Sequence, residues 1–177
     1  KWMYEKQFAI TGRLLGEGYE PEMFYAVEPS IQLYIAEKSE ALRELYVSSY
    51  SYAATANYIH QMATDKLVEL FGAMHPQYTR QDFYELELAS SGMVRSFMAR
   101  KCDRNFTMEQ KLRRFLSCSM TIYGVTEEKQ QQVIDRVLEM DLKSVADQLV
   151  ADAIHQADEQ YQEAERKGKA IEAARNG

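Results

Sequence analysis

Residues 107–142 read TMEQKLRRFLSCSMTIYGVTEEKQQQVIDRVLEMDL, and their apolar side chains recur at intervals of three and four. This spacing predicts two neighbouring helices separated by a stop at Gly124 and a new start at Thr126. A regular apolar face needs a surface to bury against, and a matching pair from a second copy would supply one as a four-helix bundle. We therefore predict a homodimer whose interface is formed by Leu112, Phe115, Leu116, Ser119, Met120, Tyr123, Val133, Ile134, Val137 and Leu138.

The composition is typical of a globular helical protein. The 177 residues are 46% hydrophobic and 27% charged, with only 3 Pro and 8 Gly, and straight-chain helix formers dominate. We predict an all-α multi-helix bundle. The net charge of −6 argues against a chain that wraps nucleic acid over its whole surface.

Nothing in the sequence resembles a signal peptide or the run of roughly 20 apolar residues that a membrane helix needs. The 2 cysteines, Cys102 and Cys118, form no C-x-x-C pair, and we expect both to be small buried side chains. These features favour a cytoplasmic, reduced location and no membrane partner. Because the first residue is Lys1, we also expect that the chain begins inside a longer gene product.

The remaining helices follow from the same periodicity. We expect helices over residues 2–15 and 52–71, and a helix that begins at Pro21 and that Pro29 should kink or split. A capping box at Thr79 opens another through about residue 98, and a last helix opens at Ser144. After His155 the chain becomes polar, which indicates a solvated helix or a frayed tail.

The sequence lacks the common catalytic and cofactor-binding motifs. Dinucleotide-binding, P-loop and zinc-protease motifs do not occur, and none of the 3 histidines, His60, His75 and His155, follows a Glu at the spacing of a di-iron bundle. We predict no enzymatic activity, no metal and no cofactor. One alternative stays open, namely a nucleophilic pair of Cys102 or Cys118 with His60.

The aromatic content suggests a ligand pocket. The chain has 12 Tyr and 7 Phe, many in its first half, and such residues with a few polar anchors are typical of small-molecule pockets. The candidate pocket residues are Tyr34, Tyr58, His60, Tyr84, Glu87, Met93 and Arg95. Core packing with internally paired polar groups is the alternative for each of them.

A basic cluster lies between residues 95 and 114. It consists of Arg95, Arg100, Lys101, Arg104, Lys111, Arg113 and Arg114. Phosphate binding would use such a cluster, but a solvated turn between two helices is the commoner explanation.

Several segments resemble the carboxy-terminal domain of the TetR/AcrR family of bacterial transcriptional repressors. They are residues 42–50 (LRELYVSSY), 82–95 (DFYELELASSGMVR), 112–116 (LRRFL), 123–125 (YGV) and 133–138 (VIDRVL), and the resemblance covers residues 21–142. It implies a domain that binds a small-molecule effector and dimerises through its last antiparallel helix pair, here residues 108–123 and 127–140.

The resemblance also implies domain boundaries and a missing part. The family's DNA-reading head should precede the first helix, so residues 1–16 would be a connecting helix, 17–143 the ligand-binding and dimerisation domain, and 144–177 a terminal helix and tail. Operator DNA would be bound only through that absent head. The alternative function is a helical protein-interaction adaptor without ligand or DNA.

Overall fold

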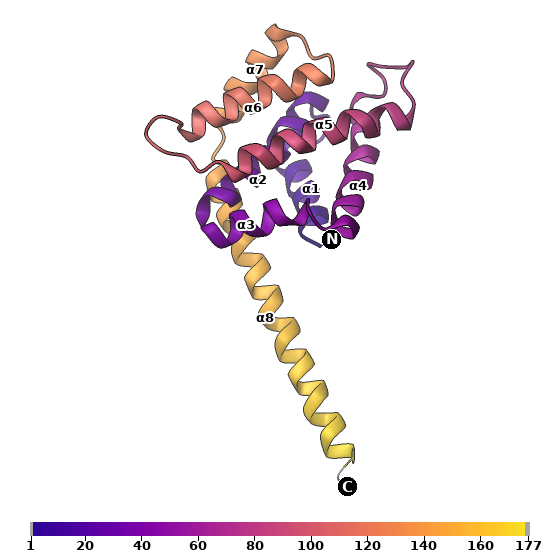
Figure 1. The fold of residues 1–177 in the computed structure, drawn as a ribbon, viewed down its shortest axis with the longest axis vertical. Helices are drawn as coiled ribbons and strands as arrows, with labels where there is room; N and C mark the ends of the chain where they lie inside the picture. The colour runs from indigo at the N-terminus through magenta and orange to yellow at the C-terminus, as the bar shows by residue number, and fades with distance from the viewer. Residues whose placement is uncertain (1, 176–177) are drawn as a thin grey trace.

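The computed structural model describes residues 2–175, with side chains described for residues 5–167. Within that part every regular element is an α-helix, which confirms the predicted all-α class (Figure 1). The helices are α1 (Trp2–Leu15), α2 (Pro21–Lys38), α3 (Glu40–Ser49), α4 (Ala53–Phe71), α5 (Arg80–Ala99), α6 (Met108–Ile122), α7 (Glu127–Glu139) and α8 (Leu142–Arg175). Lys1 and residues 176–177, which belong to the first and last predicted segments, lie outside the described residues.

Helix α2 is the centre of the fold and contacts every other helix. A helix that is apolar on all sides has to be interior, and Phe24, Tyr25 and Ile31 are all buried. Pro29 lies inside α2, where it removes the hydrogen bond to the carbonyl of Tyr25. The helix nevertheless runs unbroken from Pro21 to Lys38, so the expectation that Pro29 splits it is wrong. Packing on all sides holds the two halves together.

Both predicted capping boxes are present. The Thr79 side chain accepts a hydrogen bond from the amide of Asp82, and the Asp82 side chain accepts one from the amide of Thr79. Thr107 and Gln110 make the same reciprocal pair at the start of α6. These local bonds satisfy amides that a helix start leaves unpaired, which is why the sequence alone located both boundaries.

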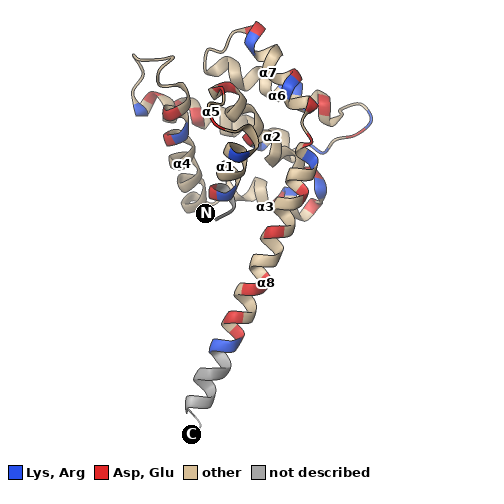
Figure 2. Ribbon diagram, turned by 180° about the vertical axis from the view of Figure 1, so that it is seen from behind, with Lys and Arg blue, Asp and Glu red and all other residues tan. Residues whose placement is uncertain are grey.

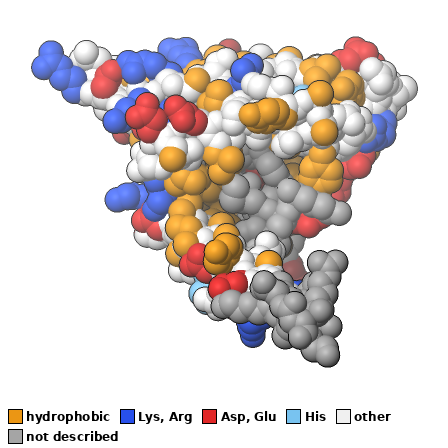
Figure 3. All heavy atoms as spheres, turned by 60° about the horizontal axis from the view of Figure 1, so that its bottom comes forward, with side chains coloured by type: hydrophobic (Ala, Val, Ile, Leu, Met, Phe, Trp, Pro, Cys, Tyr) orange, Lys and Arg blue, Asp and Glu red, His pale blue; other side chains and the backbone are white. Residues whose placement is uncertain are grey.

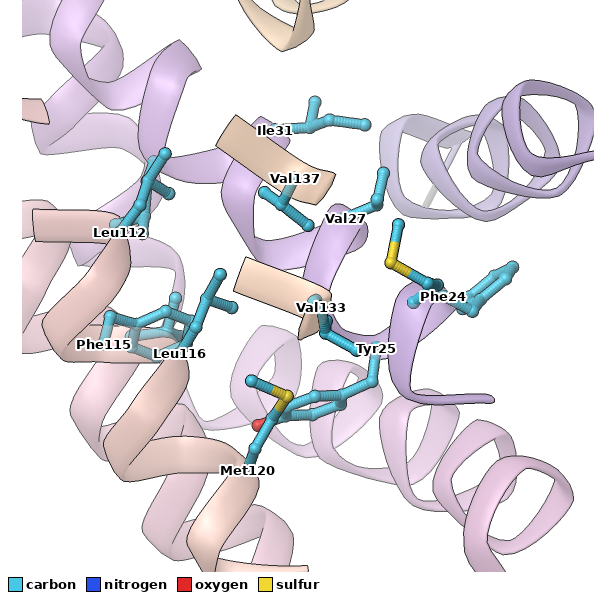
Figure 4. Close-up of a cluster of buried hydrophobic side chains, with 14 of the residues drawn as sticks. Phe24, Tyr25, Val27, Ile31, Leu112, Phe115, Leu116, Met120, Val133 and Val137 are labelled. Carbon is cyan, nitrogen blue, oxygen red and sulfur yellow. The ribbon is translucent and has the colours of Figure 1, made fainter. Parts of the chain in front are cut away.

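The apolar faces of α6 and α7 are buried inside this chain (Figure 4). Each side chain in the following set is at most 3% exposed: Leu112, Phe115, Leu116, Ser119, Met120, Tyr123, Val133, Ile134 and Val137. Leu138 is partly buried against the same core. The two helices pack on α2, and α6 also packs on α5.

The structure therefore corrects the assignment of these ten side chains to a homodimer interface, because they fill the core of their own chain. Outward-facing positions of α6 are polar or small, and those that are exposed are Glu109, Gln110, Arg114, Cys118 and Thr121. Periodicity identified a face that is buried, but it could not identify the surface that buries it. The homodimer itself stays a prediction and would need other side chains.

The cysteines also differ from expectation. Cys118 is exposed and Cys102 is partly buried, so the prediction that both are buried is wrong for Cys118. The backbone amide of Cys102 donates to the Glu37 carboxylate at 3.1 Å.

Helix α8 leaves the body as a long arm (Figure 1). It begins at Leu142, two residues before the predicted start, and Asp141 accepts a hydrogen bond from the amide of Ser144 at 3.1 Å. Its first turns pack on α2, with Leu142 and Leu149 at most 1% exposed. The expected boundary after residue 143 therefore falls inside one packed helix. Residues 157–167 are all exposed, and the chain there is a solvated helix.

Apolar side chains reach the surface in separate patches on the face shown in Figure 3. The exposed ones among the described residues include Leu45 of α3 and Tyr52, which caps α4. None of the helices in the described part combines the length and the apolar character needed to cross a membrane.

Candidate ligand-binding cavity

A cavity lies between α1, α2, α4 and α5. Its lining also includes Tyr50, which follows α3, and Phe115 of α6. About 80 Å³ of it is open to the centre of a water molecule, and the empty space between its walls, with the mouth included, is about 670 Å³. The smaller volume of about 80 Å³ has room for roughly six water molecules. A larger ligand therefore has to displace part of the wall.

Most of the wall is apolar and comes from five helices; it includes Phe8, Phe24, Ile59, Leu67, Leu70 and Phe115. The ring of Phe8, on α1, lies 6.2 Å from the ring of Phe24 between centroids. Because Phe8 belongs to the first helix, a ligand that widens the cavity on this side has to push against α1.

Glu28 and Gln32 lie one turn apart on the cavity side of α2. Gln32 Nε2 donates to Glu28 Oε1 at 2.6 Å. Gln32 is 4% exposed, and its Oε1 has no hydrogen-bond partner among the described residues. Burial raises the pKa of Glu28 to about 7, although the Gln32 hydrogen bond opposes that rise. This wall of the cavity is thus rich in acceptors.

Glu87, on α5, forms a buried pair with His60 of α4. The distance from His60 Nδ1 to Glu87 Oε2 is 2.6 Å, and Glu87 is 3% exposed. Burial raises the pKa of Glu87 to about 8, against an opposing hydrogen bond from Ser91, and burial lowers the pKa of His60. At neutral pH the pair therefore holds one shared proton and no net charge.

The hydroxyl of Tyr25 is within electrostatic reach of both Glu28 and Glu87. Burial is the main cause that raises the pKa of its hydroxyl, and negative charge on Glu28 and on Glu87 adds to the rise. Both carboxyl groups are therefore close enough to act on one buried hydroxyl, although they come from α2 and α5.

Lys66 also lines the cavity, but its charge is engaged elsewhere. Its Nζ donates to Glu69 Oε1 at 2.7 Å and lies 4.3 Å from the centroid of the Phe24 ring. Lys66 is not among the causes that shift the pKa of Glu28 or Glu87. The two buried acids are not neutralised by it.

One of the seven predicted pocket residues, Glu87, lines this cavity, and His60 contacts Glu87. The Tyr84 ring meets the His60 ring edge-on at 6.3 Å. Tyr58 donates to Glu5 of α1 at 3.4 Å, so it joins α4 to α1 rather than lining the cavity.

The other three predicted residues lie elsewhere. Arg95 is exposed and donates to Ser51 Oγ at 3.0 Å, and Met93 packs against the core. Tyr34 lies close to Asp141, whose charge helps to raise its pKa after burial. Each was chosen by residue type, which does not tell a cavity wall from ordinary packing.

Sequence reasoning missed Glu28, Gln32 and Phe8. The first two sit on α2, whose apolar residues predict a core helix. The available signal was a pair of polar side chains at i and i+4 inside that apolar helix, next to Pro29.

The predicted basic cluster spans the end of α5, the loop that follows it and the start of α6, where Figure 2 colours Lys and Arg blue on the ribbon. Lys111 is fully buried and donates to Glu37 Oε1 at 2.5 Å, and Arg113 pairs with Asp135 at 2.9 Å. Arg100 pairs with an aspartate in its own loop. The arrangement agrees with a structural and solvated role for these charges.

Metal-binding groups of three or more His, Cys, Asp or Glu side chains do not occur in the described part of the chain. His60 bonds to Glu87, and the backbone amide of Cys102 donates to Glu37. Comparisons with protein-family models, with curated proteins and with solved structures found no match.

Proposed function

We propose that the chain is the effector-binding domain of a TetR-like bacterial transcriptional regulator, in which a small molecule occupies the cavity between α1, α2, α4 and α5. The observation that carries the proposal is the position of Phe8. It forms part of the cavity wall and belongs to α1, the helix that would connect to a DNA-reading head. Ligand entry and head position would then share one element.

The contacts of α1 support a helix that can shift. Lys6 holds it to Asp152 of α8 at 2.5 Å, at the surface. Gln7 and Thr11 are fully buried, yet their side-chain polar atoms have no hydrogen-bond partner among the described residues. Unmatched buried polar atoms cost about 1–3 kcal/mol each, so they lower the free energy that favours the docked position of α1. A ligand that binds better with α1 displaced would shift the population toward that state.

A homodimer is part of this proposal, and α8 offers a surface for it. Val150, Ile154, Ala157 and Tyr161 follow the alternating spacing of four and three that forms a seam between paired helices. Ile154 is 59% exposed and Tyr161 is 72% exposed on an arm that projects from the body. A second copy of α8 would cover this stripe.

The ligand-binding part can be tested with naphthylmethanol, a neutral aromatic alcohol, by isothermal titration calorimetry. Ala63 lines the cavity, so Ala63→Trp should fill it and abolish binding, whereas Ala89→Trp, at an exposed position of α5, should leave binding unchanged. Circular dichroism checks that both variants stay helical. Equal binding to the unmodified chain and to the Ala63→Trp variant would refute the cavity as a ligand site.

The dimer can be tested by sedimentation equilibrium. Ile154→Glu combined with Tyr161→Glu should convert a dimer to a monomer, while Gln162→Glu, exposed on the same helix, should not. A monomer in the unmodified protein would contradict this surface. The alternative function, a helical adaptor, gains support if the chain is monomeric and naphthylmethanol does not bind.

A further inference from the structure

We infer that the cavity takes a lipophilic organic cation, meaning an aromatic or hydrocarbon body with one ammonium-type charge, held between the carboxyl groups of Glu28 and Glu87. The inference rests on the proposed function and names the ligand class of the same site. Two buried acids from different helices face an aromatic-lined space, and neither has an ion pair with a Lys or Arg among the described residues.

The cavity wall holds carboxyl and amide oxygens that can accept, beside the donors Lys66, Ser90 and Ser91. Glu28 and Glu87 supply carboxyl oxygens, and the buried Oε1 of Gln32 has no donor within the described part of the chain. A neutral or anionic ligand would leave most of these acceptors unmatched, whereas an ammonium group supplies positive charge and, when it carries hydrogens, donors.

The aromatic walls fit the same ligand. A cation over an aromatic face is attracted by the ring quadrupole, and the attraction grows when the site excludes water. The Phe24 ring already accepts one such contact, from Lys66 Nζ at 4.3 Å. Phe8, Tyr25 and Phe115 provide further rings in the lining.

The charged and titratable groups that face the two acids are few. Around Glu28 they are Tyr25 on α2 and Lys66 across the cavity on α4. Around Glu87 they are His60 on α4, Tyr25 on α2 and Tyr123, which follows α6. His60 shares one proton with Glu87 and Lys66 is paired with Glu69, so a site for one positive charge is left.

Protonation gives the inference a second, independent signature. Burial raises the pKa of Glu28 to about 7 and that of Glu87 to about 8, so both carry protons over part of the neutral range. A bound cation favours the ionised carboxylate and releases a proton to solvent. Affinity for a permanent cation should therefore rise between pH 6 and pH 8, by up to about tenfold per pH unit for each proton released.

The test compares three naphthalene compounds of nearly equal size by isothermal titration calorimetry: naphthylmethyltrimethylammonium, naphthylmethanol and naphthoate. The permanent cation should bind at least about tenfold more tightly than the alcohol at pH 8, and naphthoate should bind most weakly. The preference for the cation should shrink toward pH 6, while the affinity for the alcohol stays constant. Buffers with different ionisation enthalpies report the released proton directly.

Glu28→Gln and Glu87→Gln should each remove most of the preference for the cation and keep the binding of the alcohol. Glu44→Gln, at an exposed position of α3, is the matched control and should change neither. Equal affinity for cation and alcohol overturns the inference and leaves the proposed function standing. A preference for the cation that survives both cavity variants places the cation outside the cavity and also overturns the inference. Binding of none of the three compounds refutes the proposed function itself.

Discussion

Glu28→Gln should stabilise the protein at neutral and alkaline pH and change its stability little near pH 4.5. Burial raises the pKa of Glu28 from 4.5 to about 7 in the folded chain. Between these two values the folded state binds a proton that the unfolded state has lost, so the free energy of unfolding falls as pH rises through this window. Gln has the same shape and does not ionise, so the variant is free of this loss.

The rise of the pKa from 4.5 to about 7 corresponds to an upper limit of about 3.4 kcal/mol. Glu28 keeps some accessible surface toward the cavity, and water there reduces the penalty, so we expect about 2 kcal/mol above pH 7. The difference between variant and unmodified protein should approach zero near pH 4.5, where both side chains are neutral.

Urea denaturation followed by circular dichroism, at intervals from pH 4.5 to pH 8.5, measures this difference. Other carboxyl groups titrate in both proteins, so their contributions cancel in the comparison. Glu44→Gln, exposed on α3, should show no such pH dependence. A Glu28→Gln variant whose stabilisation is the same at pH 5 and pH 8, or that is destabilised at pH 8, would refute the buried, unpaired state of this carboxyl.

Three further substitutions test the packing, each by chemical denaturation. Phe115→Glu places a charge at a position that is 1% exposed, so the chain should unfold. A variant that sediments as a folded monomer would instead support the assignment of this face to a dimer interface. Lys111→Met should cost about 3 kcal/mol, because the Glu37 carboxylate loses a fully buried partner; an unchanged stability would mean that Glu37 does not need it. Thr11→Val removes a buried hydroxyl that has no hydrogen-bond partner among residues 5–167 and should stabilise the protein by about 1 kcal/mol, and a loss of stability would reveal a bond at that hydroxyl.

Gly124 shows how far local sequence information reaches. Its φ is +70°, and an added Cβ would lie 3.0 Å from Cε1 of His75. The left-handed backbone is a local requirement that a glycine signals by itself. The contact with His75 comes from a distant segment, and no pattern near Gly124 indicates it.

The apolar faces of α6 and α7 show the same difference between what local sequence indicates and what distant contacts decide. The spacing of Leu112, Phe115 and Val133 required that one face of each helix be hidden from water, and both faces are hidden. Burial against a second copy and burial against α2 produce the same spacing. Only the packing of α2 in the same chain decided between them.

The sequence by itself therefore determined the helical class, the buried faces and the capped helix starts, because these depend on residues within a few positions of one another. The tertiary structure decided which surfaces cover those faces and which polar groups meet. Glu28 and Glu87 are separated by almost sixty positions, and only the packing of α2 against α5 brings them to one cavity. Burial raises the pKa of both carboxyl groups, and that burial is a property of the assembled helices.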